Sequence, residues 1–120
     1  MHPALETFLN EYKTMLQSTK NMIETTQEKF VAIQQEIRTT GVTDDLLSNL
    51  FVISHNLFQT SYLLMEAHMR VNNIRANYSE EDQKIIDSYD EVSKRANTIV
   101  RNIITYKQSF EKTEGNDLEV

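Results

Sequence analysis

Residues 46–65 read LLSNLFVISHNLFQTSYLLM and contain no charged side chain, although 25% of the whole chain is charged. Leu50, Leu57, Leu64 and Val71 recur every seven residues, which places them on one face of a helix. The pattern predicts a long helix at the centre of the protein. Neighbouring heptad positions widen its expected core-facing arc on two sides, with Leu46, Ile53, Ala67 and Ile74 on one and Phe51, Phe58 and Met65 on the other.

The stretch has the length of a membrane-spanning helix, but its composition does not fit one. A spanning helix is predominantly apolar. Polar residues instead recur through the stretch: Ser48, Asn49, Ser54, His55, Asn56, Gln59, Thr60 and Ser61. We therefore expect no membrane association.

Composition narrows the class of protein further. A length of 120 residues fits one domain, expected over residues 1–113, with a disordered acidic tail at 114–120. Two glycines and one proline allow long unbroken helices. The absence of cysteine excludes disulfides, thiol catalysis and thiolate metal sites. A net charge of −6 disfavours binding to nucleic acid or to an anionic membrane.

A first helix is expected from about Pro3 to Thr39. Proline suits the first turn of a helix, and Gly41 stands where a glycine commonly ends one. An apolar stripe at heptad spacing runs along this segment, interrupted by Thr19 and Thr26. A break in the Thr25–Thr26 region would divide the first helix into two.

The other two helices are expected to begin at capping residues. Thr43 precedes two aspartates, and the central helix should extend from there to about Asn77. Ser79 precedes three acidic residues and should cap a third helix. Short links force neighbouring helices to be antiparallel. The predicted fold is therefore all-α, an up-down-up antiparallel bundle of three long helices, or of four if the first is broken.

The side of the central helix opposite Leu50 carries Val52, His55, Gln59, Tyr62 and Leu63, beside Ser48. A solvated helix back usually carries Lys and Glu, whereas this one is neutral and partly apolar. Charged residues are depleted at the cores of protein interfaces. We interpret these five residues as a partner-binding surface, the partner being another protein or a second copy. Coverage by another segment of the same chain and a chance depletion of charge are the alternatives.

No chemistry-bearing cluster is visible in the sequence. The three histidines are His2, His55 and His68, and none has a second ligand at the helical spacing of a metal site. No nucleophile with a base, phosphate-binding glycine loop or inward pair of carboxylates can be identified. We expect no enzyme activity, no cofactor and no metal.

The acidic residues between Glu80 and Glu91 are typical of a solvated helix start, and docking of a basic partner is the alternative.

The segment from His55 to Ser61 resembles the histidine-phosphotransfer motif, in which an exposed histidine on a bundle helix precedes Leu, Lys-Gly and Ser. Leu57 and Ser61 match, whereas Phe58 and Gln59 replace the Lys-Gly. The resemblance implies a signalling module that carries a phosphoryl group on His55. Within that family the lysine helps neutralise the phosphoryl group, and the glycine admits the receiver domain.

The segment from Tyr78 to Asp82 contains Tyr-x-x-x-Asp and resembles the small helical substrates of type VII secretion. Those proteins carry Trp-x-Gly at a hairpin turn, and this chain has no tryptophan. An ordinary turn with an acidic helix start is the alternative.

Taken together, the sequence predicts a non-catalytic, cytoplasmic bundle that acts through protein–protein interaction as an adaptor, a chaperone-like binder or an inhibitor, of phage or mobile-element origin. The phosphotransfer module is the second hypothesis.

Overall fold

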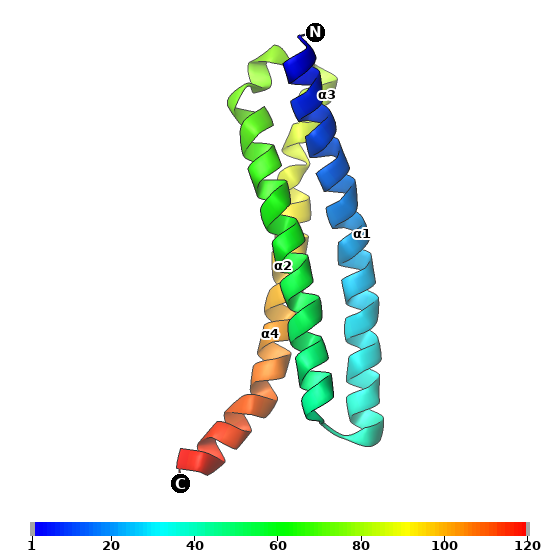
Figure 1. Cartoon of the computed structure of the whole chain (residues 1–120), viewed down its shortest axis with the longest axis vertical. Coiled ribbons are helices and arrows are strands. Elements are labelled where there is room, and N and C mark those ends of the chain that lie inside the picture. The colour runs from blue at the N-terminus through cyan, green and yellow to red at the C-terminus, as the bar shows by residue number, and fades with distance from the viewer. Residues whose placement is uncertain (1, 120) are drawn as a thin grey trace.

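A computed structural model describes the backbone of residues 2–119 and the side chains of residues 2–111. Over that range the chain forms helices α1 (Pro3–Thr40), α2 (Asp44–Asn73), α3 (Glu80–Asp87) and α4 (Tyr89–Glu119), with a 3₁₀ turn η1 (Arg75–Asn77) between α2 and α3. Three long segments run up, down and up along an elongated molecule of 63 × 28 × 18 Å (Figure 1). The predicted all-α antiparallel bundle is confirmed.

Three helix ends predicted from the sequence are confirmed by their caps. The backbone N–H of Gly41 donates to the Ile37 carbonyl, with φ of 85° at the glycine, which ends α1. The Thr43 hydroxyl accepts a hydrogen bond from the Leu46 N–H at the start of α2. The Ser79 hydroxyl accepts one from the Asp82 N–H at the start of α3.

The possible break in the first helix is wrong, because α1 is continuous through Thr25 and Thr26. Thr19 and Thr26 are buried within the apolar stripe rather than at a kink. The Thr19 hydroxyl donates to the Met15 carbonyl at 2.8 Å, so its polar group is satisfied within the helix. A buried threonine of this kind interrupts the pattern of apolar residues without interrupting the helix.

The third segment, expected as one helix, is interrupted at Ser88 between α3 and α4. The Ser88 and Tyr12 hydroxyls donate to the Ile85 carbonyl, and Tyr12 also donates to the Ile86 carbonyl. These bonds satisfy carbonyl groups at the end of α3, so the helix is interrupted there without leaving them unpaired. The central helix is also shorter than expected, since α2 ends at Asn73 and η1 takes the residues up to Asn77.

The core has two parts along the length of the bundle. Near α3, Tyr12, Leu64, Ile86 and other buried residues pack together. Toward the α1–α2 turn, Leu50 and Ile103 pack with Ile33, Ile37, Leu46, Leu47 and Ile53. Figure 1 shows α1 and α2 side by side with α4 behind α2, and the C-terminal part of α4 bending away from α1. The chain therefore has no fourth long helix in residues 2–119 to cover the outer side of α2.

Side chains beyond Glu111 and the whole of Val120 lie outside the described residues. The backbone of residues 114–119 belongs to the last part of α4, and the expected disorder of the tail at 114–120 stays a prediction. Among the described residues, no helix is both long and apolar enough to cross a bilayer.

Candidate functional site

All five residues predicted to bind a partner lie on α2 and are exposed. Val52, Tyr62 and Leu63 have exposed fractions of 48%, 49% and 51%. Neither α1 nor α4 covers them, so coverage by the same chain does not explain the missing charges. Two further apolar residues belong to the same surface, which we call the α2 face: Phe51, Val52, His55, Phe58, Gln59, Tyr62 and Leu63.

Phe51 and Phe58 were expected on a core-facing flank of α2, and that expectation is wrong. Their exposed fractions are 55% and 54%. Both lie about 100–120° around the helix from the core position of Leu57. In a three-helix bundle that direction meets the edge of the contact with α4, not its centre. The sequence signal was present in their spacing, but it could not tell a wide core from a wide exposed stripe.

The two phenylalanines line a groove between α2 and α4. Its floor and walls comprise Phe51, Ser54, His55 and Phe58 from α2 and Val100, Ile104, Lys107, Gln108 and Glu111 from α4. Ile104 is exposed, with a fraction of 41%, and extends the apolar surface onto α4. A second hollow on α2 itself is lined by His55, Phe58, Gln59, Tyr62 and Leu63. The apolar surface is therefore continuous along more than three turns of α2.

Charges lie only at the two ends of this surface. Lys107 and Glu111, which form an ion pair, border the groove at the Phe51 end, because α4 runs antiparallel to α2. Beyond Leu63 the same side of α2 continues with Glu66 and Arg70, and Arg70 pairs with Glu11 of α1 at 3.3 Å. Each end thus carries both signs of charge, and the centre carries none.

His55 lies in the middle of the α2 face and borders both hollows. Its ring stacks on Phe51, with ring centroids 5.5 Å apart and an interplanar angle of 12°. The two residues that depart from the phosphotransfer motif, Phe58 and Gln59, stand beside it on the same surface. No cationic side chain of α2 lies within this group, so neutralisation of a phosphoryl group at His55 would depend on Lys107 across the groove.

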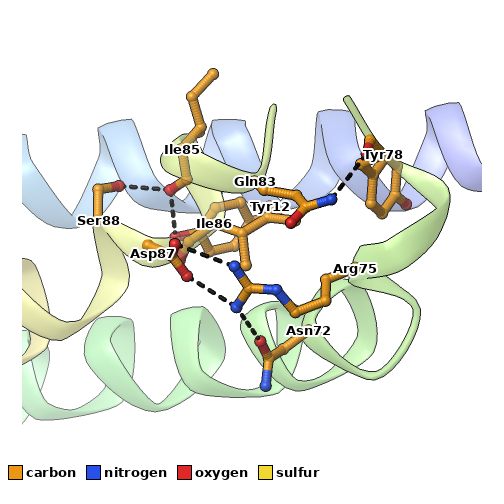
Figure 2. A network of polar contacts seen from close by, with 9 residues as sticks. All are labelled: Tyr12, Asn72, Arg75, Tyr78, Gln83, Ile85, Ile86, Asp87 and Ser88. Atoms are coloured by element: carbon orange, nitrogen blue, oxygen red, sulfur yellow. Dashed lines mark hydrogen bonds and ion pairs between the residues drawn. The ribbon is translucent and has the colours of Figure 1, made fainter. Parts of the chain in front are cut away.

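A different kind of site lies at the α3 end, where a network of polar contacts joins buried and exposed side chains (Figure 2). No buried side-chain nitrogen or oxygen of the described residues lacks a hydrogen-bond partner. The Tyr12 hydroxyl donates to the Ile85 and Ile86 carbonyls at 3.1 and 3.0 Å. Arg75 forms an ion pair with Asp87 at 2.8 Å, and it also donates to the Asn72 side chain at 3.1 Å. Burial raises the pKa of Tyr12 to about 12. The hydrogen bond and ion pair that Asp87 makes with Arg75 lower the pKa of Asp87.

Tyr78, the first residue of the Tyr-x-x-x-Asp motif, belongs to this structural network. Its hydroxyl donates to the Leu5 carbonyl at 2.7 Å, and its side chain is buried. The last residue, Asp82, lies 3.6 Å from the Lys13 ammonium group. The motif therefore ties the start of α3 to α1, which is the role of an ordinary structural turn.

His68 is half-buried at the same end, where it packs between two tyrosines. Its ring stacks on Tyr89 with centroids 4.0 Å apart, and it lies 5.9 Å from the Tyr12 ring. Burial lowers the pKa of His68. No group of three or more His, Asp or Glu side chains able to hold a metal occurs among the residues that the structure describes.

Comparisons with protein-family models, with curated proteins and with solved structures yield no match to this chain. The functional argument therefore depends on the molecule's own geometry.

Proposed function

We propose that this protein is a non-catalytic helical bundle that acts by binding a protein chain through the α2 face. The observation that supports this most strongly is the exposure of five large apolar side chains on one uncharged helix face: Phe51, Val52, Phe58, Tyr62 and Leu63. The largest apolar patch on a monomeric protein spans about 300–600 Å² and often has a role in binding.

The composition of the surface matches that of an interface core. Aromatic residues are enriched and charged residues depleted at such cores, while charges occupy the rim. Here three aromatic residues and His55 lie at the centre, and Lys107, Glu111, Glu66 and Arg70 lie at the ends. The role of an adaptor, chaperone-like binder or inhibitor is consistent with such a surface, as is a cytoplasmic location.

The direct test replaces two central residues of the α2 face with charges, as Gln59→Glu with Tyr62→Lys. Wild type, this variant and a matched α1 variant, Gln35→Glu with Thr39→Lys, are compared in capture from native lysate and in sedimentation velocity. We expect association with self or with another protein for wild type and the α1 variant, and loss of it for the α2 variant. Equal association of all three proteins would refute the proposal.

A second candidate function, histidine phosphotransfer, is favoured by the exposure of His55 beside a groove. Incubation with a phosphorylated receiver domain would then give phosphohistidine at residue 55 in wild type and not in His55→Ala. Because Phe58 and Gln59 occupy the Lys-Gly positions, we expect no phosphohistidine, and we expect His55→Ala to retain function.

A further inference from the structure

We propose that the occupant of the α2 face is a second copy of this chain, placed antiparallel across a two-fold axis near Leu57. This inference rests on the proposed function and names its partner. Three properties of the surface support it: the order of residue types along α2, the distribution of charge and the available area.

The residue order along the α2 face is nearly the same in both directions. An apolar pair, Phe51 and Val52, stands at one end, and another, Tyr62 and Leu63, stands at the other. His55 and Gln59 lie between them, each two residues from position 57. When two copies meet antiparallel about that position, each apolar pair lies against the other copy's opposite pair. His55 then lies against Gln59 of the other copy, where imidazole and amide can exchange hydrogen bonds.

The charge distribution permits this contact although each chain carries a net charge of −6. The central surface has no charge, so two copies bring no like charges together there. Antiparallel placement puts the end that carries Lys107 and Glu111 over the end that carries Glu66 and Arg70. Because each end holds both signs, the rims can pair with opposite charges. A strongly basic partner would find no matching acidic centre on this surface.

The area is sufficient for a dimer of moderate affinity. Phe51, Phe58 and Tyr62 are each about half exposed, and aromatic side chains bury about 150–250 Å² each, so the three rings offer roughly 300 Å². Val52, Leu63 and Ile104 bring the apolar surface to roughly 500 Å². A standard interface takes about 800 Å² from each partner. The polar residues around the apolar surface supply the remaining area. In the dimer, α2 of each copy covers the exposed side of α2 of the other copy.

The first test introduces a charge at Gln59, because the two-fold axis brings Gln59 of one copy close to Gln59 of the other copy. Gln59→Glu and Gln59→Lys should each weaken self-association more than tenfold in sedimentation equilibrium, because each places two like charges in a desolvated interface. An equimolar mixture of the two variants should associate at least tenfold more tightly than either alone. Gln35→Glu and Gln35→Lys on α1 serve as controls and should dimerise like wild type. A mixture that associates no better than its components would overturn the two-fold arrangement.

The second test determines orientation and uses the absence of native cysteine. Antiparallel copies place Val52 of one copy against Tyr62 of the other. The two Val52 residues then lie roughly 15 Å apart along the axis of the α2 helices. Val52→Cys mixed with Tyr62→Cys should form a disulfide-linked heterodimer, and Val52→Cys alone should form little linked dimer. Linkage of Val52→Cys to itself in preference to the mixture would overturn the antiparallel arrangement.

The failure of this inference is distinguishable from failure of the proposed function. Wild type that stays monomeric up to about 200 µM, a concentration at which a micromolar dimer forms, overturns the second copy as occupant. If that monomer captures another protein, and Gln59→Glu with Tyr62→Lys abolishes the capture, the proposed function stands with a different partner. A monomer with no capture that depends on the α2 face refutes both.

Discussion

The α3 end and the α2 face hold tyrosine side chains in opposite environments. At the α3 end, Tyr12 and Tyr78 are buried, and each hydroxyl donates to a backbone carbonyl of a distant segment. On the α2 face, Tyr62 is half exposed, among apolar neighbours. A tyrosine that ties helices together has its ring covered and its hydroxyl paired. A tyrosine left with an exposed ring on an uncharged surface is instead suited to a partner.

The largest expected effect compares the two kinds of tyrosine by removing each ring. Tyr12 has an exposed fraction of 0%, and truncation of a buried aromatic to alanine costs about 3–5 kcal/mol of unfolding free energy. Tyr12→Ala should therefore lower stability by about that amount in urea denaturation, while Tyr62→Ala should change it by less than about 0.5 kcal/mol. Similar losses in the two variants would show that the α2 face is covered in the monomer.

A smaller effect isolates the hydroxyl group of Tyr12. Tyr12→Phe keeps the ring but removes the donor to the Ile85 and Ile86 carbonyls. Loss of a buried partner costs about 1–3 kcal/mol, although Ser88 still donates to the Ile85 carbonyl and should keep the loss near the lower value. Tyr62→Phe is the matched control and should be neutral in the same denaturation experiment. If Tyr12→Phe has the same unfolding free energy as the wild type, the interruption between α3 and α4 does not depend on the hydrogen bonds of the Tyr12 hydroxyl.

The sequence predicted the elements that depend on local patterns. Heptads of Leu50, Leu57 and Leu64 identified the core side of α2, and Thr43, Ser79 and Gly41 located helix ends to within a residue or so. These features depend on neighbours three or four residues away, which the sequence displays directly. The exposed positions of Val52 and Tyr62 followed from the same geometry, because they lie opposite the core stripe.

The break at Ser88 and the exposure of Phe51 and Phe58 could not be predicted in the same way. The break is stabilised by Tyr12, 76 positions from Ser88 in the chain (88 minus 12), and nothing near Ser88 indicates that contact. The exposure of the phenylalanines depends on how far α4 wraps around α2. Periodicity places residues on a helix face, but packing between helices decides how wide the covered arc is.

A third prediction concerns pH and the α3 end. Burial lowers the pKa of His68 below its ordinary 6.5, although Asp90 acts in the opposite direction and Arg75 acts with burial. Between the folded and the ordinary pKa the unfolded chain binds more protons, so the free energy of unfolding falls as the pH drops through that window. His68→Phe, which retains a ring to stack on Tyr89, should show a shallower fall between pH 7.5 and 5.5 in thermal denaturation.

The contrary result for His68 is equally clear. If wild type and His68→Phe lose stability in parallel as the pH falls, the stacked histidine is not the group that senses pH. The acid sensitivity would then belong to another group that titrates in this range, because Asp87, whose pKa is lowered by its hydrogen bond and ion pair with Arg75, loses its contribution only below its ordinary pKa of 3.8.

The smallest expected effect on stability is at the α2 face, where the effect on binding should be largest. Gln59→Glu with Tyr62→Lys adds an acid and a base three residues apart on an exposed helix, an arrangement that stabilises helices slightly. Helix content by circular dichroism should stay unchanged, and the unfolding free energy at low protein concentration should differ from wild type by less than about 0.5 kcal/mol. Concentration separates folding from binding, because a dimer of wild type gains stability as concentration rises and a monomeric variant does not. Wild type and variant that gain stability equally with concentration would mean that Gln59 and Tyr62 face only solvent, and the absence of charge on α2 would then have no role in binding.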